Sequence, residues 1–378
     1  MTTSGHDVVV IGAGPAGSAA AYFCAVNGLR TLLLEASPWP REKVCGGGLT
    51  PWAMDLIDCL VGLGDEPDEP GFWPVTRLAV RYGPFPPLGT VTDRGGAMLH
   101  VVSRSALDAF LVHRAMKQRV QFLAGFHASR IRDTGDPGYP VAVDTFGGPG
   151  KPAGSFPARF VIGADGIGSV AARYIGLPKP DRLTRAIECH LRTTEATDEE
   201  AVLDAGAVRQ GYAWSFPAGT HLSLGIGSAA AAVTFWELEE RLAVFARRIG
   251  VYLDPEVPRW RWSLPIRDTW HDLDRGRVCV AGDAAGLVDP ITGEGIGPAL
   301  LSGMLAGEAV VDALDNHCYD QTSQPLCIYS AQVQAWWGLR RSNPKLLGGI
   351  LFGLWAAHWL PPVRRWLLDW LLGGVMRK

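Results

Sequence analysis

Three glycines near the start of the chain are spaced for binding a phosphate group. They are Gly12, Gly14 and Gly17 in the segment Asp7-Val-Val-Val-Ile-Gly-Ala-Gly-Pro-Ala-Gly17. Gly12 permits a tight turn, Gly14 lets the backbone approach a pyrophosphate, and Gly17 lets a helix pack close to the preceding strand. The start of that helix offers free N–H groups and the positive end of the helix dipole, and Ala16 in the turn before it is a further candidate for contact with the cofactor. This spacing therefore predicts a site for an adenine dinucleotide.

The elements that would position these glycines lie on both sides of them. The apolar run Val8 to Ile11 predicts a strand before the turn, and the Ala-rich stretch Ser18 to Val26 predicts a helix after it. A second apolar strand, Thr31 to Leu34, ends in Glu35 and Ala36. An acid about 20 residues beyond the glycines suits a ribose 2′-hydroxyl and repels a 2′-phosphate. The whole order favours a dinucleotide-binding unit over a chance glycine-rich turn.

Length, charge and cysteine usage narrow the class of protein. At 378 residues the chain predicts one large domain or two interleaved domains. The net charge of -3 gives no basic surface and argues against nucleic acid as a partner. The 7 cysteines form no CxxC pair and no metal-ligand pattern, which favours a reduced protein without a metal. Because the first strand starts by about residue 7, no signal peptide fits before it, and a cytoplasmic location is expected.

Two further strand ends carry a glycine and an acid. One is Asp165-Gly166, after the apolar run Phe160 to Ile162; the other is Gly282-Asp283, after Val278 to Val280. Three such turns predict one cofactor held from three sides, with Asp283 accepting a hydrogen bond from a sugar-alcohol hydroxyl. A helix from about Pro298 to Leu314 would direct its positive end at the same cofactor. The residues that lead into this helix and that we expect at the cofactor are Pro290, Gly293, Gly295 and Ile296.

A cysteine followed by three glycines forms another candidate segment. The sequence Arg41-Glu-Lys-Val-Cys45-Gly-Gly-Gly48 predicts a backbone that can pass close to a planar ring, with Arg41, Cys45, Gly46 and Gly47 near the cofactor. Arg104 opens a helix that is predicted to run to Lys117, an unfavourable place for a cation if only the helix dipole acted on it. Arg104 is therefore a candidate for contacting cofactor phosphates or ribityl hydroxyls; the alternative is a solvated surface arginine.

An aromatic stripe marks the predicted second half of the molecule. Tyr212, Trp214 and Phe216 alternate along one strand and so share a face. Such a stripe is either part of a core or the wall along which an apolar substrate lies.

The chain divides into two interleaved regions and a tail. We expect residues 1–64, 98–179 and 271–324 to form a discontinuous cofactor-binding α/β domain, and residues 65–97 and 180–270 to form an antiparallel substrate-binding sheet. Residues 325–378 form a Trp-rich helical segment. Within it, the apolar stretch 346–360 is too short for a clear membrane span. Trp and Arg side chains around it suit an interfacial helix with peripheral membrane contact, or a helical cap on the substrate domain.

These motifs together resemble those of the FAD-dependent p-hydroxybenzoate hydroxylase superfamily, over roughly residues 5 to 315. Its fingerprints are matched by Gly12-Ala-Gly14-Pro-Ala-Gly17, Gly163-Ala-Asp165-Gly166 and Gly282-Asp283. Within the superfamily the chain is most similar to the geranylgeranyl reductase family, through Lys43-Val-Cys45-Gly-Gly-Gly48 and Tyr212-Ala-Trp214-Ser-Phe216-Pro217. The family motif commonly has a proline three positions before the tyrosine, where this chain has Arg209.

The resemblance implies a fold, a cofactor and a reaction. It implies a glutathione-reductase-type FAD domain, a nicotinamide nucleotide, NADH or NADPH, as electron donor, and reduction of a carbon–carbon double bond in an apolar, isoprenoid substrate. Tyr212 and Trp214 would act in catalysis and, with Phe216, bind the substrate. Cys45 would donate a proton or position the substrate; the alternative is a buried inert thiol.

Two other functions stay open on the same fold. A flavin monooxygenase, hydroxylase or halogenase is the first, and Trp260-Arg-Trp262-Ser-Leu-Pro265 superficially resembles the halogenase WxWxIP pattern, although it lies later in the chain than expected. A non-catalytic prenyl-binding protein of the GDP-dissociation inhibitor type is the second. Two motifs argue against a non-catalytic prenyl-binding protein: the intact Asp283 turn and the run Gly293-Glu-Gly-Ile-Gly297. Both are expected to hold a flavin, and a pure binding protein has no need of one.

Overall fold

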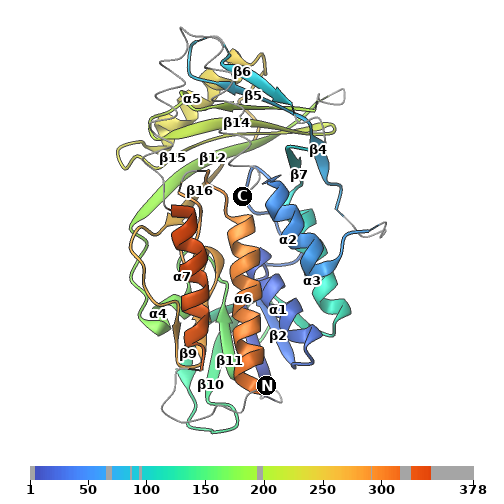
Figure 1. Cartoon of the computed structure of the whole chain (residues 1–378), viewed down its shortest axis with the longest axis vertical. Helices are drawn as coiled ribbons and strands as arrows, with labels where there is room; N and C mark the ends of the chain where they lie inside the picture. The colour runs from blue at the N-terminus through green and yellow to red at the C-terminus, as the bar shows by residue number, and fades with distance from the viewer. Residues whose placement is uncertain are drawn as a thin grey trace.

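Two sheets, one above the other in Figure 1, organise the part of the chain that the structure describes. This computed structural model describes residues 5–64, 70–85, 87–92, 96–193, 199–290, 292–315 and 325–341. The lower sheet is mixed, with a parallel centre, and the upper sheet is mostly antiparallel. The expected α/β class with an added antiparallel sheet is thus confirmed. The predicted Trp-rich stretches beyond residue 341 lie outside the described residues.

The lower sheet is built around the first strand. In the described part of the chain it has eight strands: β1 (His6–Ile11), β2 (Thr31–Glu35), β8 (Gln121–Ala124), β9 (Phe126–Asp133), β10 (Val141–Gly147), β11 (Gly154–Gly163), β17 (Asp274–Arg275) and β18 (Val278–Val280). The strands β18, β11, β1, β2 and β8 run parallel in that order. Residues Val8 to Val10 are fully buried, as expected for a parallel strand that is covered on both faces.

Helices and one short turn surround this sheet. They are α1 (Pro15–Val26), α2 (Pro51–Val61), α3 (Arg104–Lys117), α4 (Val170–Ile175), α6 (Ile296–Asp315), α7 (Cys327–Arg341) and the 3-10 turn η1 (Gly282–Ala284). Helix α3 begins where its sequence predicts, because the hydroxyl of Ser103 accepts a hydrogen bond from the Ala106 N–H. Thr50 caps α2 in the same way through the Ala53 N–H.

The upper sheet carries the aromatic stripe. Its seven strands among the described residues are β5 (Arg77–Arg81), β6 (Gly89–Thr92), β12 (Arg182–Arg192), β13 (Glu200–Asp204), β14 (Gly211–Ala218), β15 (His221–Ser228) and β16 (Trp260–Ile266). Helix α5 (Phe235–Arg248) packs on its outer face, where Ile187, Leu224 and Ile226 meet Leu238 and Leu242. The opposite face of the sheet, with the aromatic residues of β14, is turned toward the lower half of the molecule.

A small three-stranded sheet connects the two halves in the described region. It consists of β3 (Gly48–Leu49), β4 (Trp73–Val75) and β7 (Leu99–Val101). Strand β3 directly follows the glycine run after Cys45, and β7 directly precedes α3. The loop with Cys45 and the start of α3 are therefore held on adjacent strands, although more than fifty residues of sequence separate them.

Helix α6 is the one helix in the described ranges that is long and apolar enough to cross a membrane by composition. Its most apolar window is 67% buried inside the protein. It packs closely against α1: a Cβ atom added at Gly303 would lie 2.1 Å from the Ala16 carbonyl oxygen. This helix is therefore a core helix that presses on the start of the phosphate-binding helix.

Helix α7 opens the segment that the sequence sets apart as a tail, and it packs on the lower sheet. Tyr329 and Val333 are fully buried in the same cluster as the strands of this sheet. The Tyr329 hydroxyl donates to the Val280 carbonyl at 2.7 Å, and the Ser330 hydroxyl accepts from the Leu273 N–H at 2.8 Å. The described part of the tail thus packs on the lower sheet and not on the upper sheet, which carries the aromatic stripe.

The approach of α6 to α1 gives a test of the packing. We expect Gly303→Ala to destabilise the protein by about 1–3 kcal/mol, because the added methyl group meets backbone, even though alanine is the better helix former. Gly338→Ala in α7 is the matched control: nothing lies within 4 Å of its added Cβ, so its stability should be unchanged or rise by up to about 1 kcal/mol. Urea unfolding followed by circular dichroism measures both, and equal effects would contradict the proposed packing constraint.

Candidate functional site

The first glycine turn is shaped by neighbouring backbone. Gly12 has a φ of +98°, and a Cβ atom there would lie 2.3 Å from the Ala164 carbonyl oxygen. At Gly17 a Cβ atom would lie 1.8 Å from the Gly12 carbonyl oxygen. Gly14 is the N-cap of α1 and supplies no side-chain hydrogen bond to it. The first N–H groups of α1 are thus capped by no side chain, in the arrangement that binds a phosphate.

The three glycine-containing turns lie side by side, at the carboxyl ends of the adjacent parallel strands β1, β11 and β18. Each turn is tied to the neighbouring strand by a backbone hydrogen bond. The Gly12 N–H donates to the Leu34 carbonyl at 2.7 Å, and the Ala164 N–H donates to the Ile11 carbonyl at 2.8 Å. The Ala281 N–H donates to the Gly163 carbonyl at 2.9 Å. Gly282 then approaches the first turn closely, since a Cβ atom on it would lie 3.0 Å from the Ala16 Cβ. The structure therefore brings together the segments that the sequence predicts at one cofactor.

Glu35 ends β2 and points back at the glycine turn. It is 6% exposed and accepts hydrogen bonds from the N–H groups of Ala13 at 3.1 Å and Ser37 at 3.0 Å. Arg41 Nε lies 3.1 Å from the same carboxylate. The neighbouring Ala36 is exposed. The carboxylate is thus fixed beside the turn, where a ribose would lie in the predicted dinucleotide site.

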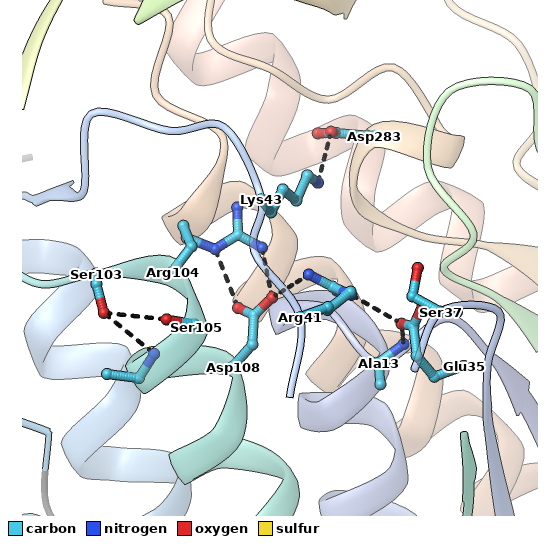
Figure 2. A network of polar contacts seen from close by, with 11 residues as sticks. Ala13, Glu35, Ser37, Arg41, Lys43, Ser103, Arg104, Ser105, Asp108 and Asp283 are labelled. Carbon is cyan, nitrogen blue, oxygen red and sulfur yellow. Dashed lines mark hydrogen bonds and ion pairs between the residues drawn. The ribbon is translucent and has the colours of Figure 1, made fainter. Parts of the chain in front are cut away.

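Asp108 connects two arginines, and the sequence analysis missed it (Figure 2). It is fully buried and accepts hydrogen bonds from Arg104 Nε at 3.0 Å and Nη2 at 2.8 Å, while Arg41 Nη1 lies 2.9 Å away. Burial is the largest single effect on Arg104 and lowers its pKa, but the charge and hydrogen bonds of Asp108, together with other nearby groups that include Asp283, raise the pKa overall. A Cβ atom on Gly14 would lie 3.7 Å from Arg41 Nη2 and 3.9 Å from Arg104 Nη2. Arg104 is therefore no solvated surface arginine.

The donors around Gly14 fit a pyrophosphate. Two guanidinium groups and the start of α1 converge on a backbone position that has no side chain, and planar guanidinium groups match phosphate oxygens well. The signal for Asp108 was its place four residues after Arg104, one helical turn along the same face. This donor set is consistent with the diphosphate of FAD.

The third turn places Asp283 beside Lys43. Asp283 lies in η1, and its carboxylate is 3.5 Å from Lys43 Nζ (Figure 2). The Gly282 N–H donates to the Ser302 hydroxyl at 3.0 Å, which ties the turn to α6. A Cβ atom on Gly295 would lie 3.6 Å from Asp283 Oδ1. Asp283 therefore lies close to Gly295, which directly precedes Ile296, the first residue of α6. The partly buried Pro290 lies on the segment between η1 and α6.

The Asp165 carboxylate in the second turn bonds to the residues that follow it in the chain. Its carboxylate accepts hydrogen bonds from the Ser169 hydroxyl and from the Val170 N–H, the latter at 2.6 Å. These bonds lower the pKa of Asp165, but burial has the larger effect and raises it. Gly166, with a φ of +69°, completes the turn. The carboxylate of Asp165 thus organises the start of α4, and its backbone is what lies against Gly12.

The Cys45 loop packs directly against the aromatic stripe. A Cβ atom on Gly46 would lie 2.8 Å from Trp214 Nε1, and one on Gly48 would lie 2.9 Å from the Phe216 ring. Gly47, with a φ of +70°, turns the chain beside Val102. The sequence predicts a backbone that passes close to a planar ring, and the rings present at Gly46 and Gly48 are those of β14.

The aromatic residues of β14 differ in their surroundings. Trp214 is 8% exposed and donates from Nε1 to the Ser223 hydroxyl at 3.3 Å. The Tyr212 hydroxyl donates to the Thr292 carbonyl, next to Gly293. Burial raises the pKa of Tyr212, and the carboxylates of Asp289 and Glu294 add to the shift. Tyr212 therefore stays neutral and ties the upper sheet to the segment before α6.

Burial also governs the Cys45 thiol. It raises the pKa of Cys45, and the nearby Arg104 opposes this shift without cancelling it. The thiol is thus neutral at physiological pH, which excludes the reactive thiolate of a nucleophilic cysteine.

Comparisons with known proteins agree with this geometry. Residues 5–203 match the family model described as FAD binding domain. The digeranylgeranylglycerophospholipid reductase of Methanocaldococcus jannaschii is 30% identical over 320 residues, which cover 82% of this chain and 78% of the relative.

Solved structures share the fold. A geranylgeranyl bacteriochlorophyll reductase-like protein from Thermoplasma acidophilum superposes with a TM-score of 0.73 at 24% identity, over 88% of this chain and 84% of that one. A flavin-dependent halogenase superposes with a TM-score of 0.70 at 19% identity, over 89% of this chain and 63% of that one. The halogenase likeness is one of fold alone. From the family model and the sequence identity, the chain belongs to the geranylgeranyl reductase family of FAD-dependent oxidoreductases.

Proposed function

We propose that this enzyme reduces carbon–carbon double bonds in an apolar isoprenoid chain. The observation that carries the proposal is the contact of the glycine run after Cys45 with the aromatic stripe of β14. This contact sets an apolar aromatic wall beside the loop that the family resemblance puts at the flavin. The reductases named among the relatives act on lipids with prenyl chains, which such a wall suits.

The cofactor would be held by the residues of the lower sheet. Arg41, Arg104 and the start of α1 would bind the diphosphate, Glu35 a ribose, and Asp283 a hydroxyl of the ribityl chain. When bound and reduced, FAD supplies a hydride equivalent. A nicotinamide nucleotide is the proposed source of its electrons, and a cytoplasmic location with a peripheral membrane contact belongs to the same proposal.

The chain's own residues must align the double bond and supply a proton. An isolated alkene has little charge for hydrogen-bond donors to polarise, so close alignment provides most of the acceleration. Tyr212 and Phe216 are partly buried and would guide the chain, while Trp214 fixes the shape of the wall. Cys45, as a neutral thiol with a raised pKa, is a weak acid, and we assign it a role in positioning rather than in proton donation.

Product analysis tests the proposed reaction. Dithionite-reduced enzyme mixed without air with a digeranylgeranyl glycerophospholipid should yield products that gain two hydrogen atoms for each reduced double bond, as measured by mass spectrometry. Enzyme without FAD is the control and should give none. A product that gains oxygen or halogen, formed only in air, would contradict the proposal and support the oxygen-using alternative.

Asp108→Asn tests the arginine pair. We expect FAD to bind at least about tenfold more weakly, because breaking a buried ion pair is costly and leaves Arg104 and Arg41 without their common anchor. Asp55→Asn, on the exposed face of α2, is the matched control and should bind FAD as the wild type does. Flavin fluorescence quenching measures both dissociation constants. Unchanged or tighter binding by Asp108→Asn would show that orientation by Asp108 does not matter.

Cys45→Ser tests the positioning role. Serine keeps the small polar side chain, so we expect turnover to fall less than about tenfold, whereas loss of a general acid costs about 100-fold or more. Stopped-flow mixing of the reduced variant with substrate, at FAD saturation, measures the rate. A loss of 100-fold with normal FAD content would make Cys45 the proton donor.

A further inference from the structure

A buried carboxyl group lies on the same sheet face as the aromatic stripe. Glu188 on β12 is 1% exposed and stands opposite Gly225 of β15, which in turn stands opposite Trp214. Residues that are directly opposite in a sheet share a face, so Glu188 and Trp214 point to the same side. The other side of β12 presents Ile187 to α5. Glu188 therefore faces the half of the molecule that holds the Cys45 loop.

The two oxygens of Glu188 have different surroundings. Oε1 accepts a hydrogen bond from the Ser223 hydroxyl at 2.9 Å and lies 2.8 Å from His190 Nε2. Oε2 is buried and has no hydrogen-bond partner among the described residues. A buried carboxylate oxygen without a partner is costly, and a role in the chemistry of the site is one explanation for it. Because Oε1 already accepts two bonds, a proton on this carboxyl group would reside on Oε2.

The carboxyl group is connected to both the substrate wall and the solvent. Ser223 accepts from Trp214 Nε1 at 3.3 Å, and Trp214 contacts the backbone at Gly46. On the other side, the His190 side chain is 36% exposed. Glu188 is also close enough to Cys45 to act on the pKa of its thiol. The chain of contacts thus runs from solvent through His190 and Glu188 to the wall beside the Cys45 loop.

We propose that Glu188 is the proton donor for double-bond reduction and that His190 is the positioning residue that returns the proton to it. This inference rests on the proposed function. Reduction of an alkene adds a hydride to one carbon, supplied by reduced FAD, and a proton to the other. The Oε2–H bond of Glu188 breaks as the new C–H bond forms. The resulting carboxylate takes a proton from the His190 imidazolium on the oxygen that contacts the histidine. Rotation of the carboxyl group then exchanges the two oxygens and turns the new O–H toward the wall, and His190 regains its proton from the solvent.

An apolar substrate would itself drive this transfer. Before substrate binds, water reaches the exposed part of His190 and favours the charged pair, with the proton on His190. A prenyl chain along the wall excludes water, and a charged pair in an apolar site is less stable than a neutral one. The proton then moves to Glu188, where the reaction needs it. Proton donation would thus be favoured only when the apolar substrate is in place.

The surroundings of His190 fix the sign of a pH effect. The hydrogen bond to Glu188 raises the pKa of His190; burial opposes this shift, and Glu42 in the loop after β2 adds to it. Strand β15 places Ser223 opposite His190, and β16 contributes the Trp260 ring, whose centroid is 5.1 Å from that of His190. As the pH rises through this raised pKa, the proton source is lost, so the rate of product formation should fall.

The test is a single turnover by anaerobic, dithionite-reduced holoenzyme with a digeranylgeranyl glycerophospholipid. Glu188→Gln keeps the shape and hydrogen bonds of the side chain but cannot supply the proton, so we expect product formation to slow at least about 100-fold. Its FAD content and its reduction by dithionite should be unchanged. His190→Gln should lose the fall in rate at high pH. Glu200→Gln, on β13 of the same sheet, is the matched control and should react like the wild type.

Two readouts separate proton donation from a structural role. The solvent deuterium isotope effect on the single turnover should be clear in the wild type and should change in Glu188→Gln. In proton NMR titrations of the FAD-loaded proteins, the pKa of His190, assigned from its missing signal in His190→Gln, should be lower in Glu188→Gln. If Glu188→Gln needs more substrate to saturate but reaches the same maximal single-turnover rate, Glu188 binds substrate and the proposal is overturned.

The outcomes distinguish the two levels of inference. If the wild type gives no reduced product, the proposed function fails and the proton donor with it. If the wild type reduces the lipid and folded, FAD-loaded Glu188→Gln does so at the same rate, only the assignment of Glu188 fails. Should Glu188→Gln not fold, His190→Gln decides, because an unchanged pH profile in that variant would overturn the relay.

Discussion

The buried carboxylate of Asp108 is the interaction on which the cofactor half depends. Two guanidinium groups beside a glycine turn would repel each other, and one fully buried anion between them removes this conflict. Because Arg41 comes from the loop after β2 and Arg104 from the start of α3, Asp108 also ties two distant segments together. Arg41 in turn pairs with Glu35, so one chain of charges extends from α3 to the end of β2 (Figure 2). In the proposed site, a diphosphate would thus meet cations whose positions are set before it binds.

The second constraint is the absence of side chains where the two halves meet. At Gly46 and Gly48 a methyl group would collide with Trp214 and Phe216, so the loop after Cys45 can lie on the aromatic stripe only as bare backbone. Gly225 serves the same wall from the other side, since a Cβ atom there would lie 2.1 Å from the Trp214 ring. The glycines that the sequence predicts near a flavin therefore also determine how the upper sheet packs on the lower half of the molecule.

The sequence predicted the features that are carried by local patterns. The glycine turn, the helix from Arg104 to Lys117 and the strand of aromatic residues have periodic or motif signals and were found. Helix α2 was not predicted, although Thr50 and Pro51 form a typical helix start. Asp108 and Glu188 were missed as well. Their importance comes from partners distant in sequence, Arg41 and Ser223, which only the fold brings near.

A single acid inside an apolar strand is nevertheless a signal that can be read from sequence. The segment Ala186-Ile-Glu-Cys-His190 places a glutamate and a histidine two residues apart, hence on one face of a strand that is otherwise suited to burial. Charged residues are rarely buried unless they are paired, so this pattern requires a partner for the glutamate. The histidine satisfies one oxygen only. Glu188, with one unsatisfied oxygen, shares its face of the upper sheet with the aromatic stripe, and it therefore lies where the proposed reduction would need a proton.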